Sequence, residues 1–142
     1  MILFRHAISA RLEKRNMAKI LIVEDDLLLH KMYRKKFEVA GFVVDAAYDG
    51  EEAIGKMKTF APDIVLLDVM MPKLNGIQVL EKAQADSTLR HIPVIVLTNL
   101  GGAIDAQTAL KKGAVSYMVK SDFTPSEVVA KVQEFLSTRK VG

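Results

Sequence analysis

Short apolar runs alternate with helical patterns along this chain from residue 19 onward. Four runs of four or five residues stand between polar or turn residues, at positions 19–23, 64–67, 93–97 and 116–119. Runs of this length, rich in valine, isoleucine and leucine, are typical of strands buried on both faces of a parallel sheet. A fifth run at 43–47 has a similar character, so the pattern predicts five strands.

The two segments between the runs at 19–23, 43–47 and 64–67 repeat apolar residues at helical spacing. A helix is expected to end before Gly41, with an apolar stripe formed by Leu28, Leu29, Met32, Tyr33, Phe37 and Ala40. Asp49 is placed to cap a second helix, which passes through Met57 and closes before Pro62. Strand and helix therefore alternate from the start of the domain.

Three further helices are predicted after the third strand. One runs from Gly76 through Ala83, and another spans about Ala103 to Lys112. The last begins with a capping box at 124–127, with proline at its first helical position. Its apolar stripe consists of Val128, Val129, Val132, Phe135 and Leu136. The whole pattern predicts an α/β fold with a parallel sheet.

Polar residues follow four of the five strands directly. Glu24-Asp25-Asp26 follows the first, Asp68 the third, Thr98 the fourth and Lys120 the fifth. In an open α/β sheet, ligands bind beyond the carboxyl ends of the strands. We therefore expect carboxylates, a hydroxyl and an ammonium group to meet in one place. That set of groups suits metal-assisted transfer of a phosphoryl group to an aspartate.

Composition and charge narrow the function further. The chain has 142 residues, 50% of them hydrophobic and 26% charged, which suits one globular domain with a real core. It has no cysteine, which excludes disulfides and thiolate metal sites. The three histidines have no ligand spacing and are expected on the surface or in loops: His6, His30 and His91.

The net charge of +3 belongs entirely to residues 1–16, which hold four basic side chains and one acidic side chain. Residues 17–142 are then balanced, so no basic face for nucleic acid is indicated. We divide the chain into this N-terminal extension, 1–16, and a domain, 17–142. The extension is either an upstream or non-native segment before a natural start at Met17, or a short amphipathic basic helix that touches a membrane or a partner. It does not have the pattern of a signal peptide.

Residues 18 to about 140 resemble the receiver domain of two-component response regulators. The resemblance is carried by residues 20–26, by residues 68–76, by Thr98 and by Lys120, in this order and spacing. It implies a flavodoxin-like, doubly wound, five-stranded parallel sheet in the order 2-1-3-4-5, with five helices. The chain would be a stand-alone receiver without an attached output domain.

The resemblance also implies a role for each site residue. Asp68 would be the phosphoacceptor, and Thr98 and Lys120 would contact the phosphoryl oxygens. Mg²⁺ would be bound by Asp25 directly, by Glu24 through water, by Asp68, and by the backbone carbonyl of Met70. Asp26 is expected to cap the first helix instead.

Each of these residues also has a plainer explanation. Asp68 would merely cap a turn, while Thr98 and Lys120 are ordinary residues at a strand end and convince only together. Tyr117 either turns inward when Thr98 moves, as in the family, or is simply a half-exposed strand residue. These two interpretations of Tyr117 remain equal at this point.

Three departures from the family pattern affect the expectations. Ser121 stands where proline usually follows the lysine, so we expect a trans bond between Lys120 and Ser121. Asn99 is larger than the usual residue after the threonine and would slow access of a phosphodonor. Met70 and Leu100 are both apolar at positions that tune water access, which suggests slow hydrolysis of the aspartyl phosphate.

The leading hypothesis is a signalling switch that receives a phosphoryl group from a histidine kinase or phosphotransfer protein. Output would be protein binding by the face of the fourth helix, fifth strand and fifth helix. We expect a cytoplasmic protein, monomeric or weakly dimeric, that binds neither nucleic acid nor membrane. It would catalyse only its own phosphorylation and dephosphorylation, and would not be a turnover enzyme.

Two other classes of protein, a binding module and an enzyme, are alternatives. A protein-binding module that works without phosphorylation on the same fold is the main alternative, although the complete set of site residues disfavours it. A dinucleotide-binding enzyme would need a glycine-rich turn where Glu24-Asp25-Asp26 stands. A dehalogenase-type phosphatase would want a second aspartate where Met70 stands.

Overall fold

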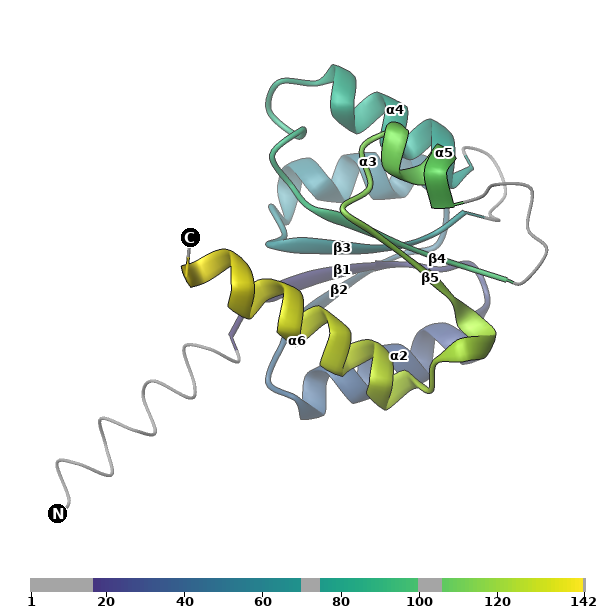
Figure 1. Cartoon of the computed structure of the whole chain (residues 1–142), viewed down its shortest axis with the longest axis vertical. Coiled ribbons are helices and arrows are strands. Elements are labelled where there is room, and N and C mark those ends of the chain that lie inside the picture. The colour runs from purple at the N-terminus through teal and green to yellow at the C-terminus, as the bar shows by residue number, and fades with distance from the viewer. Residues whose placement is uncertain (1–16, 70–74, 100–105, 142) are drawn as a thin grey trace, which may run out of the picture.

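The fold is built on one parallel sheet. The computed structural model describes residues 17–69, 75–99 and 106–141. Its strands are β1 (Lys19–Val23), β2 (Val43–Ala47), β3 (Ile64–Asp68), β4 (Val94–Thr98) and β5 (Ser116–Val119). They lie in the order β2-β1-β3-β4-β5, all parallel (Figure 1). Both the five strands and their expected order are confirmed.

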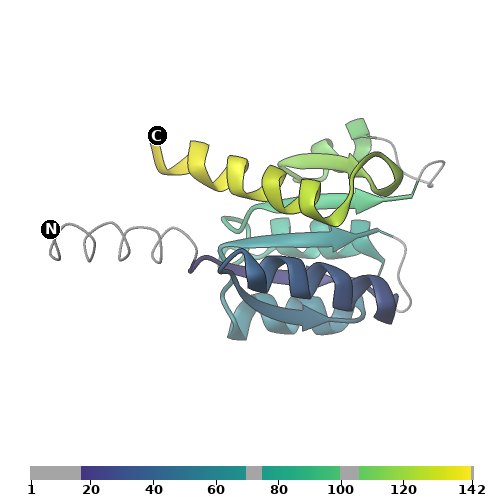
Figure 2. The ribbon, with the colours of Figure 1, turned by 90° about the horizontal axis from the view of Figure 1, so that it is seen from below.

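Helices cover both faces of the sheet. They are α2 (Leu27–Val39), α3 (Gly50–Thr59), α4 (Gly76–Ala85), α5 (Ala106–Lys111) and α6 (Pro125–Val141), and a 3-10 turn at Lys120–Asp122 precedes α6. In Figure 1, α3, α4 and α5 lie on one side of the sheet and α2 and α6 on the other. Figure 2 shows α2 and α6 in front of the sheet when it is viewed from below. The fold is thus the doubly wound one that was expected.

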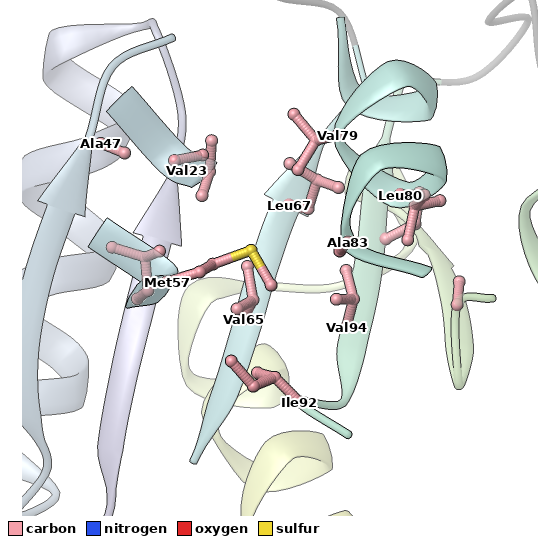
Figure 3. Packing of buried hydrophobic residues seen from close by; sticks show 14 of the residues in the cluster. Val23, Ala47, Met57, Val65, Leu67, Val79, Leu80, Ala83, Ile92 and Val94 are labelled. Atoms are coloured by element: carbon pink, nitrogen blue, oxygen red, sulfur yellow. The ribbon is translucent and has the colours of Figure 1, made fainter. Parts of the chain in front are cut away.

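The strands alternate their side chains between two apolar cores. On one face, side chains of β1, β3 and β4 pack with residues of α3, α4 and α5: Leu21, Val23, Val65, Leu67, Val94 and Val96. Figure 3 shows part of this core. On the other, Ile20, Ile22, Ile64, Leu66, Ile95 and Leu97 pack with α2 and α6. Because successive strand residues point to opposite faces, a continuous apolar run fills both cores.

The register of the sheet aligns the carboxyl ends of its strands. Val23 pairs with both Ala47 and Leu67, and Asp68 pairs with Leu97. Thr98 pairs with Val119, the residue before Lys120. The polar residues that close β1, β3, β4 and β5 therefore come to one edge of the sheet.

Side-chain caps fix where the helices begin. The Asp26 carboxylate accepts from the Leu29 N–H at 3.0 Å, which confirms its expected role as a cap. Asp49 caps α3 in the same way, by accepting from the Glu52 N–H at 2.9 Å. Such a cap satisfies an N–H that has no partner within the helix and typically contributes about 1 kcal/mol.

Two capping boxes begin later helices. The one expected between Thr124 and Glu127 is confirmed by bonds of 2.9 and 3.2 Å. A second, between Asn75 and Gln78 at the start of α4, was not identified from the sequence. It lies next to the segment that follows Asp68, so it helps to fix the entry to α4.

Two expectations about the first helix and its histidine were wrong. Leu28 and Met32 are 73% and 45% exposed, so they are not part of the buried stripe. His30 is only 1% exposed, so it is neither a surface nor a loop residue. The buried residues of α2 are His30, Tyr33 and Phe37, so Tyr33 and Phe37 are buried as expected while His30 joins them in place of Leu28 and Met32.

Some expectations fall on other parts of the chain. The fourth helix, expected from Ala103, is described only from Ala106, and residues 100–105 lie outside the described ranges. The N-terminal extension, residues 1–16, lies outside them as well. None of the described helices carries an apolar stretch long enough to cross a lipid bilayer.

Candidate functional site

Three carboxylates gather at the carboxyl edge of the sheet. Glu24 and Asp25 follow β1, and Asp68 is the last residue of β3. One oxygen from each lies within 4.8 Å of the others. Glu24 and Asp68 are buried, whereas Asp25 is exposed. The parallel strands β1 and β3 are neighbours, which is why residues far apart in sequence meet here.

Lys120 reaches into this cluster from the end of β5. Its Nζ lies 2.7 Å from Glu24 Oε1 and 3.3 Å from Asp68 Oδ2, and its side chain is 12% exposed. Burial by itself lowers the pKa of Lys120, but the hydrogen bond to Glu24 and the charge of Asp68 outweigh burial and raise the pKa above its ordinary value. The ammonium group is therefore held charged between two carboxylates.

The electrostatics of Glu24 reflect the crowding of negative charge. Burial and then the neighbouring Asp68 carboxylate raise the pKa of Glu24 to about 7, although Lys120 acts in the opposite direction. A single ammonium does not fully compensate three carboxylates, two of them buried. The site is therefore suited to a further cation.

The donor set fits Mg²⁺. This ion takes oxygen ligands, binds few protein groups and keeps several waters. Glu24, Asp25 and Asp68 supply only carboxylate oxygens, and the exposed Asp25 leaves one side of the cluster open to water. The expected carbonyl ligand, Met70, lies outside the described residues.

Thr98 ends β4 with a buried hydroxyl. Its side chain is 0% exposed, and Oγ1 has no hydrogen-bond partner in the described part of the chain. A buried polar group without a partner costs about 1–3 kcal/mol. The Thr98 hydroxyl would therefore gain stability from an acceptor placed within its reach.

Tyr117 lies on the neighbouring strand β5, opposite Val96. It is half-buried and packs against the core formed with α3, α4 and α5. This position agrees with both interpretations of Tyr117 made from the sequence. Its role as a moving aromatic residue stays a prediction.

Gly76 shapes the site through a close backbone approach that was not foreseen when it was placed at the start of a helix and in the motif at residues 68–76. A Cβ at this position would lie 2.5 Å from Val69 Cα and 2.8 Å from the Asp68 carbonyl oxygen. Both neighbours are backbone atoms, so they cannot rotate away. Only glycine lets α4 begin this close to the end of β3. The signal was present in the sequence as glycine directly after a capping asparagine.

The departures from the family pattern can be located in part. The described residues contain no cis peptide bond, so the bond between Lys120 and Ser121 is trans as expected. It lies within the 3-10 turn, which still brings Lys120 to the carboxylates. Asn99 is exposed, and Leu100 lies outside the described residues.

A hollow of about 470 Å³ lies elsewhere, among Met17, Asp63, Pro93 and Arg139. These residues stand before β1, β3 and β4 or near the end of α6, at the edge opposite to the carboxylates. The candidate site is thus identified by its side-chain chemistry, not by the volume of a cavity.

Comparison with known proteins identifies a family. The family model described as the response regulator receiver domain matches residues 20–133. A probable transcriptional regulator ycf27 of Guillardia theta is 40% identical over 118 residues, covering 83% of this chain and 45% of that protein. The alkaline phosphatase synthesis transcriptional regulatory protein PhoP of Bacillus subtilis is 37% identical over 87% of this chain and 50% of its own length. The chain spans about half the length of the curated relatives it matches.

Solved structures show the same fold. A CheY-like response regulator receiver domain protein of Methanospirillum hungatei superposes with a TM-score of 0.79 at 26% identity, over 89% of this chain and 99% of that one. The chemotaxis response regulator CheY4 of Vibrio cholerae gives a TM-score of 0.75 at 29% identity, over 83% of this chain and 98% of the CheY4 chain. The similarity covers nearly the whole of each solved chain.

Proposed function

The chain belongs to the response regulator receiver domain family, and we propose that it is a switch operated by phosphorylation of Asp68. The observation that carries this proposal is the contact of Lys120 with Asp68 and Glu24 inside a cluster of three carboxylates. Phosphoryl transfer to aspartate needs a nucleophilic carboxylate, an ammonium group held in place and a cluster of carboxylates that can bind a metal ion.

The transfer is an in-line displacement at phosphorus. An Asp68 carboxylate oxygen attacks the phosphorus of a phosphohistidine, and a new O–P bond forms while the donor's P–N bond breaks. The bonding pair leaves with the donor imidazole. The Lys120 ammonium stands within reach of the phosphoryl oxygens and balances their charge. Bound Mg²⁺ would supply further charge neutralisation at those oxygens.

Magnesium binding is the first expected consequence. The ion should raise the melting temperature of the protein, because a ligand at 100 times its dissociation constant adds about 2.7 kcal/mol to the free energy of unfolding. Asp25→Ala should remove most of this stabilisation, since it deletes one carboxylate of the cluster. Asp25 is exposed, so the variant should fold. The measurement is thermal unfolding with and without magnesium.

The matched control is Glu134→Ala, which removes an exposed carboxylate on α6, far along the chain from the cluster. It should keep the full magnesium shift of the parent. Equal magnesium shifts in Asp25→Ala and the parent would show that the ion binds elsewhere.

The proposed switch runs from Asp68 on β3 through Thr98 on β4 to the edge strand β5. A phosphoryl group adds acceptor oxygens that the buried Thr98 hydroxyl can reach after a small movement. Each charge-assisted hydrogen bond contributes about 1.5–3 kcal/mol, enough to bias a two-state element. Tyr117 then fills the vacated space, and the surface of α5, β5 and α6 changes shape.

That surface is the proposed output face, and its partner is another protein. A histidine kinase or phosphotransfer protein is the proposed phosphodonor, and the cytoplasm the proposed compartment. The curated relatives are described as transcriptional regulators of about twice this length, which supports a regulatory role in general. The alternative, a binding module that is never phosphorylated, has the same fold but needs none of the site chemistry.

The direct test of phosphorylation is the intact mass after incubation with acetyl phosphate. In the presence of magnesium, the protein should gain the mass of one phosphoryl group, and chelation of the metal should prevent the gain. A protein that never gains this mass, from acetyl phosphate or from a phosphorylated donor protein, would be the unphosphorylated module.

A further inference from the structure

His30 is a buried polar residue that the proposed switch does not use. It is the fourth residue of α2, at the end of the first turn, and is 1% exposed. Burying an imidazole is unfavourable unless it makes a hydrogen bond, and a leucine would fill such a place at less cost. A side-chain hydrogen bond joins its Nε2 to the Ile22 carbonyl oxygen at 3.1 Å. The bond therefore has to explain why the residue is there.

The side chain and the backbone of His30 make hydrogen bonds on either side of Glu24 and Asp25. Its side chain binds Ile22, two residues before Glu24, at 3.1 Å. Its backbone N–H donates to the carbonyl of Asp26, the residue after Asp25, at 2.8 Å, which is the first i→i−4 bond of α2 and does not depend on the side chain. The backbone from Ile22 to His30 is thus closed into a ring by one imidazole bond. Glu24 and Asp25 lie inside that ring.

The same imidazole also contacts the neighbouring strand end. Its ring stacks on Tyr48, with centroids 4.7 Å apart and an interplanar angle of 30°. Tyr48 follows Ala47, whose carbonyl accepts from the Glu24 N–H at 3.1 Å. The backbone of Glu24 is therefore bonded to the end of β2, next to Tyr48, the residue on which the His30 imidazole stacks.

The protonation of His30 agrees with a donor role. Burial lowers the pKa of His30, and Arg34 lowers it further, while the bond to Ile22 and the charge of Glu52 act the other way. A neutral imidazole carries one N–H. Because a carbonyl oxygen only accepts, the contact with Ile22 requires that hydrogen on Nε2.

We propose that His30 is a positioning residue for the magnesium site, which holds Glu24 and Asp25 in place by closing the backbone ring around them. The inference rests on the magnesium binding proposed above. Residues that orient metal ligands from behind typically change metal affinity by about 10–100-fold when they are replaced. For His30, which acts through the backbone, we expect the lower end of that range.

The test compares three variants by magnesium titration, followed through amide NMR shifts. His30→Leu keeps the volume but loses the donor, and should weaken magnesium binding by about tenfold. His30→Gln keeps a side-chain N–H and should restore most of that affinity. Phe37→Leu alters another buried residue of α2, two turns further on. It should lower the melting temperature but leave magnesium affinity unchanged.

Each outcome decides a separate point. If the parent protein binds no magnesium, the proposed metal site fails and not merely the role of His30. If the parent binds magnesium and His30→Leu binds it equally well, His30 has no positioning role. Equal losses in His30→Gln and His30→Leu, or a loss in Phe37→Leu, would reduce the effect to general destabilisation.

A second measurement needs no variant and decides the matter if His30→Leu does not fold. The imidazole nitrogen shifts of the intact protein should show hydrogen on Nε2, with coupling across the bond to the Ile22 carbonyl. Magnesium should shift the His30 imidazole signals, because binding of the ion orders the backbone segment from Ile22 to His30. A hydrogen on Nδ1, or imidazole signals that ignore magnesium, would overturn the proposal.

Discussion

Asp68→Asn is expected to abolish phosphoryl uptake from acetyl phosphate. The amide is nearly the same size as the carboxylate, so the buried position should stay filled. It is not a nucleophile, however, and it removes one negative group from the cluster of three carboxylates. Lys120 keeps its 2.7 Å bond to Glu24, so the fold around the site should persist. Intact mass should show no gain under conditions that fully label the parent.

The matched control for this variant is Asp63→Asn at the other end of the same strand. Asp63 accepts from the Lys19 N–H at 2.8 Å and is exposed. This variant should gain a phosphoryl group, as the parent does. Labelling of Asp68→Asn at the parental rate would mean that another residue is the phosphoacceptor.

Gly76→Ala is expected to damage both stability and phosphorylation. Helix propensity alone favours alanine over glycine by about 1 kcal/mol, so a simple helix argument predicts a gain. The new methyl group would instead meet Val69 Cα at 2.5 Å and the Asp68 carbonyl at 2.8 Å. Overpacking of this kind costs about 1–3 kcal/mol, and relief requires moving the backbone that carries Asp68. We expect a lower melting temperature and slower labelling by acetyl phosphate.

Gly55→Ala provides the opposite case in the same protein. Gly55 lies inside α3, and a Cβ there would meet nothing within 4 Å. Alanine at this position should stabilise the protein by about 0.5–1 kcal/mol and leave phosphorylation unchanged. If both alanine variants were equally stable and equally well labelled, the close approach of Gly76 to Val69 and Asp68 would not constrain the site.

The strands were predictable because each was marked by its own residues. The run Ile64 to Leu67 contains nothing but apolar residues, which indicates burial on both faces, and it is bounded by Asp63 and Asp68. Capping chemistry was equally local, as Thr124 and Glu127 show. The strand order was implied by family resemblance, since the pattern of runs alone does not determine which strands are neighbours.

The buried side of α2 was not predictable from periodicity alone. Leu28 and Met32 read as core because they are apolar, but both are exposed. His30 reads as a surface residue because it is polar, but its bond to a strand carbonyl makes burial favourable. Such a bond joins two elements, so its partner cannot be identified before the elements are packed. The close approach at Gly76 was missed for the same reason.

The candidate site was predictable in its members but not in its contacts. The carboxyl ends of parallel strands share one edge of the sheet, so Glu24, Asp68 and Lys120 were expected near one another, although Lys120 comes from β5, which is not a neighbour of β1 or β3. That Lys120 lies nearer to Glu24 than to Asp68 depends on side-chain geometry, which sequence spacing does not encode. Burial and the neighbouring Asp68 carboxylate raise the pKa of Glu24 to about 7, which could not be foreseen from the sequence either.

The measurement that tests the proposed switch most directly is amide NMR with beryllofluoride, a mimic of the aspartyl phosphate. In the parent protein, shifts should extend from Asp68 through Thr98 to Tyr117 and α5. In Thr98→Ala they should stay within the site, while Thr98→Ser, which keeps the hydroxyl, should restore their reach. If the shifts in the parent itself stop at the residues around Asp68, the protein binds phosphoryl groups without switching, and the account is contradicted.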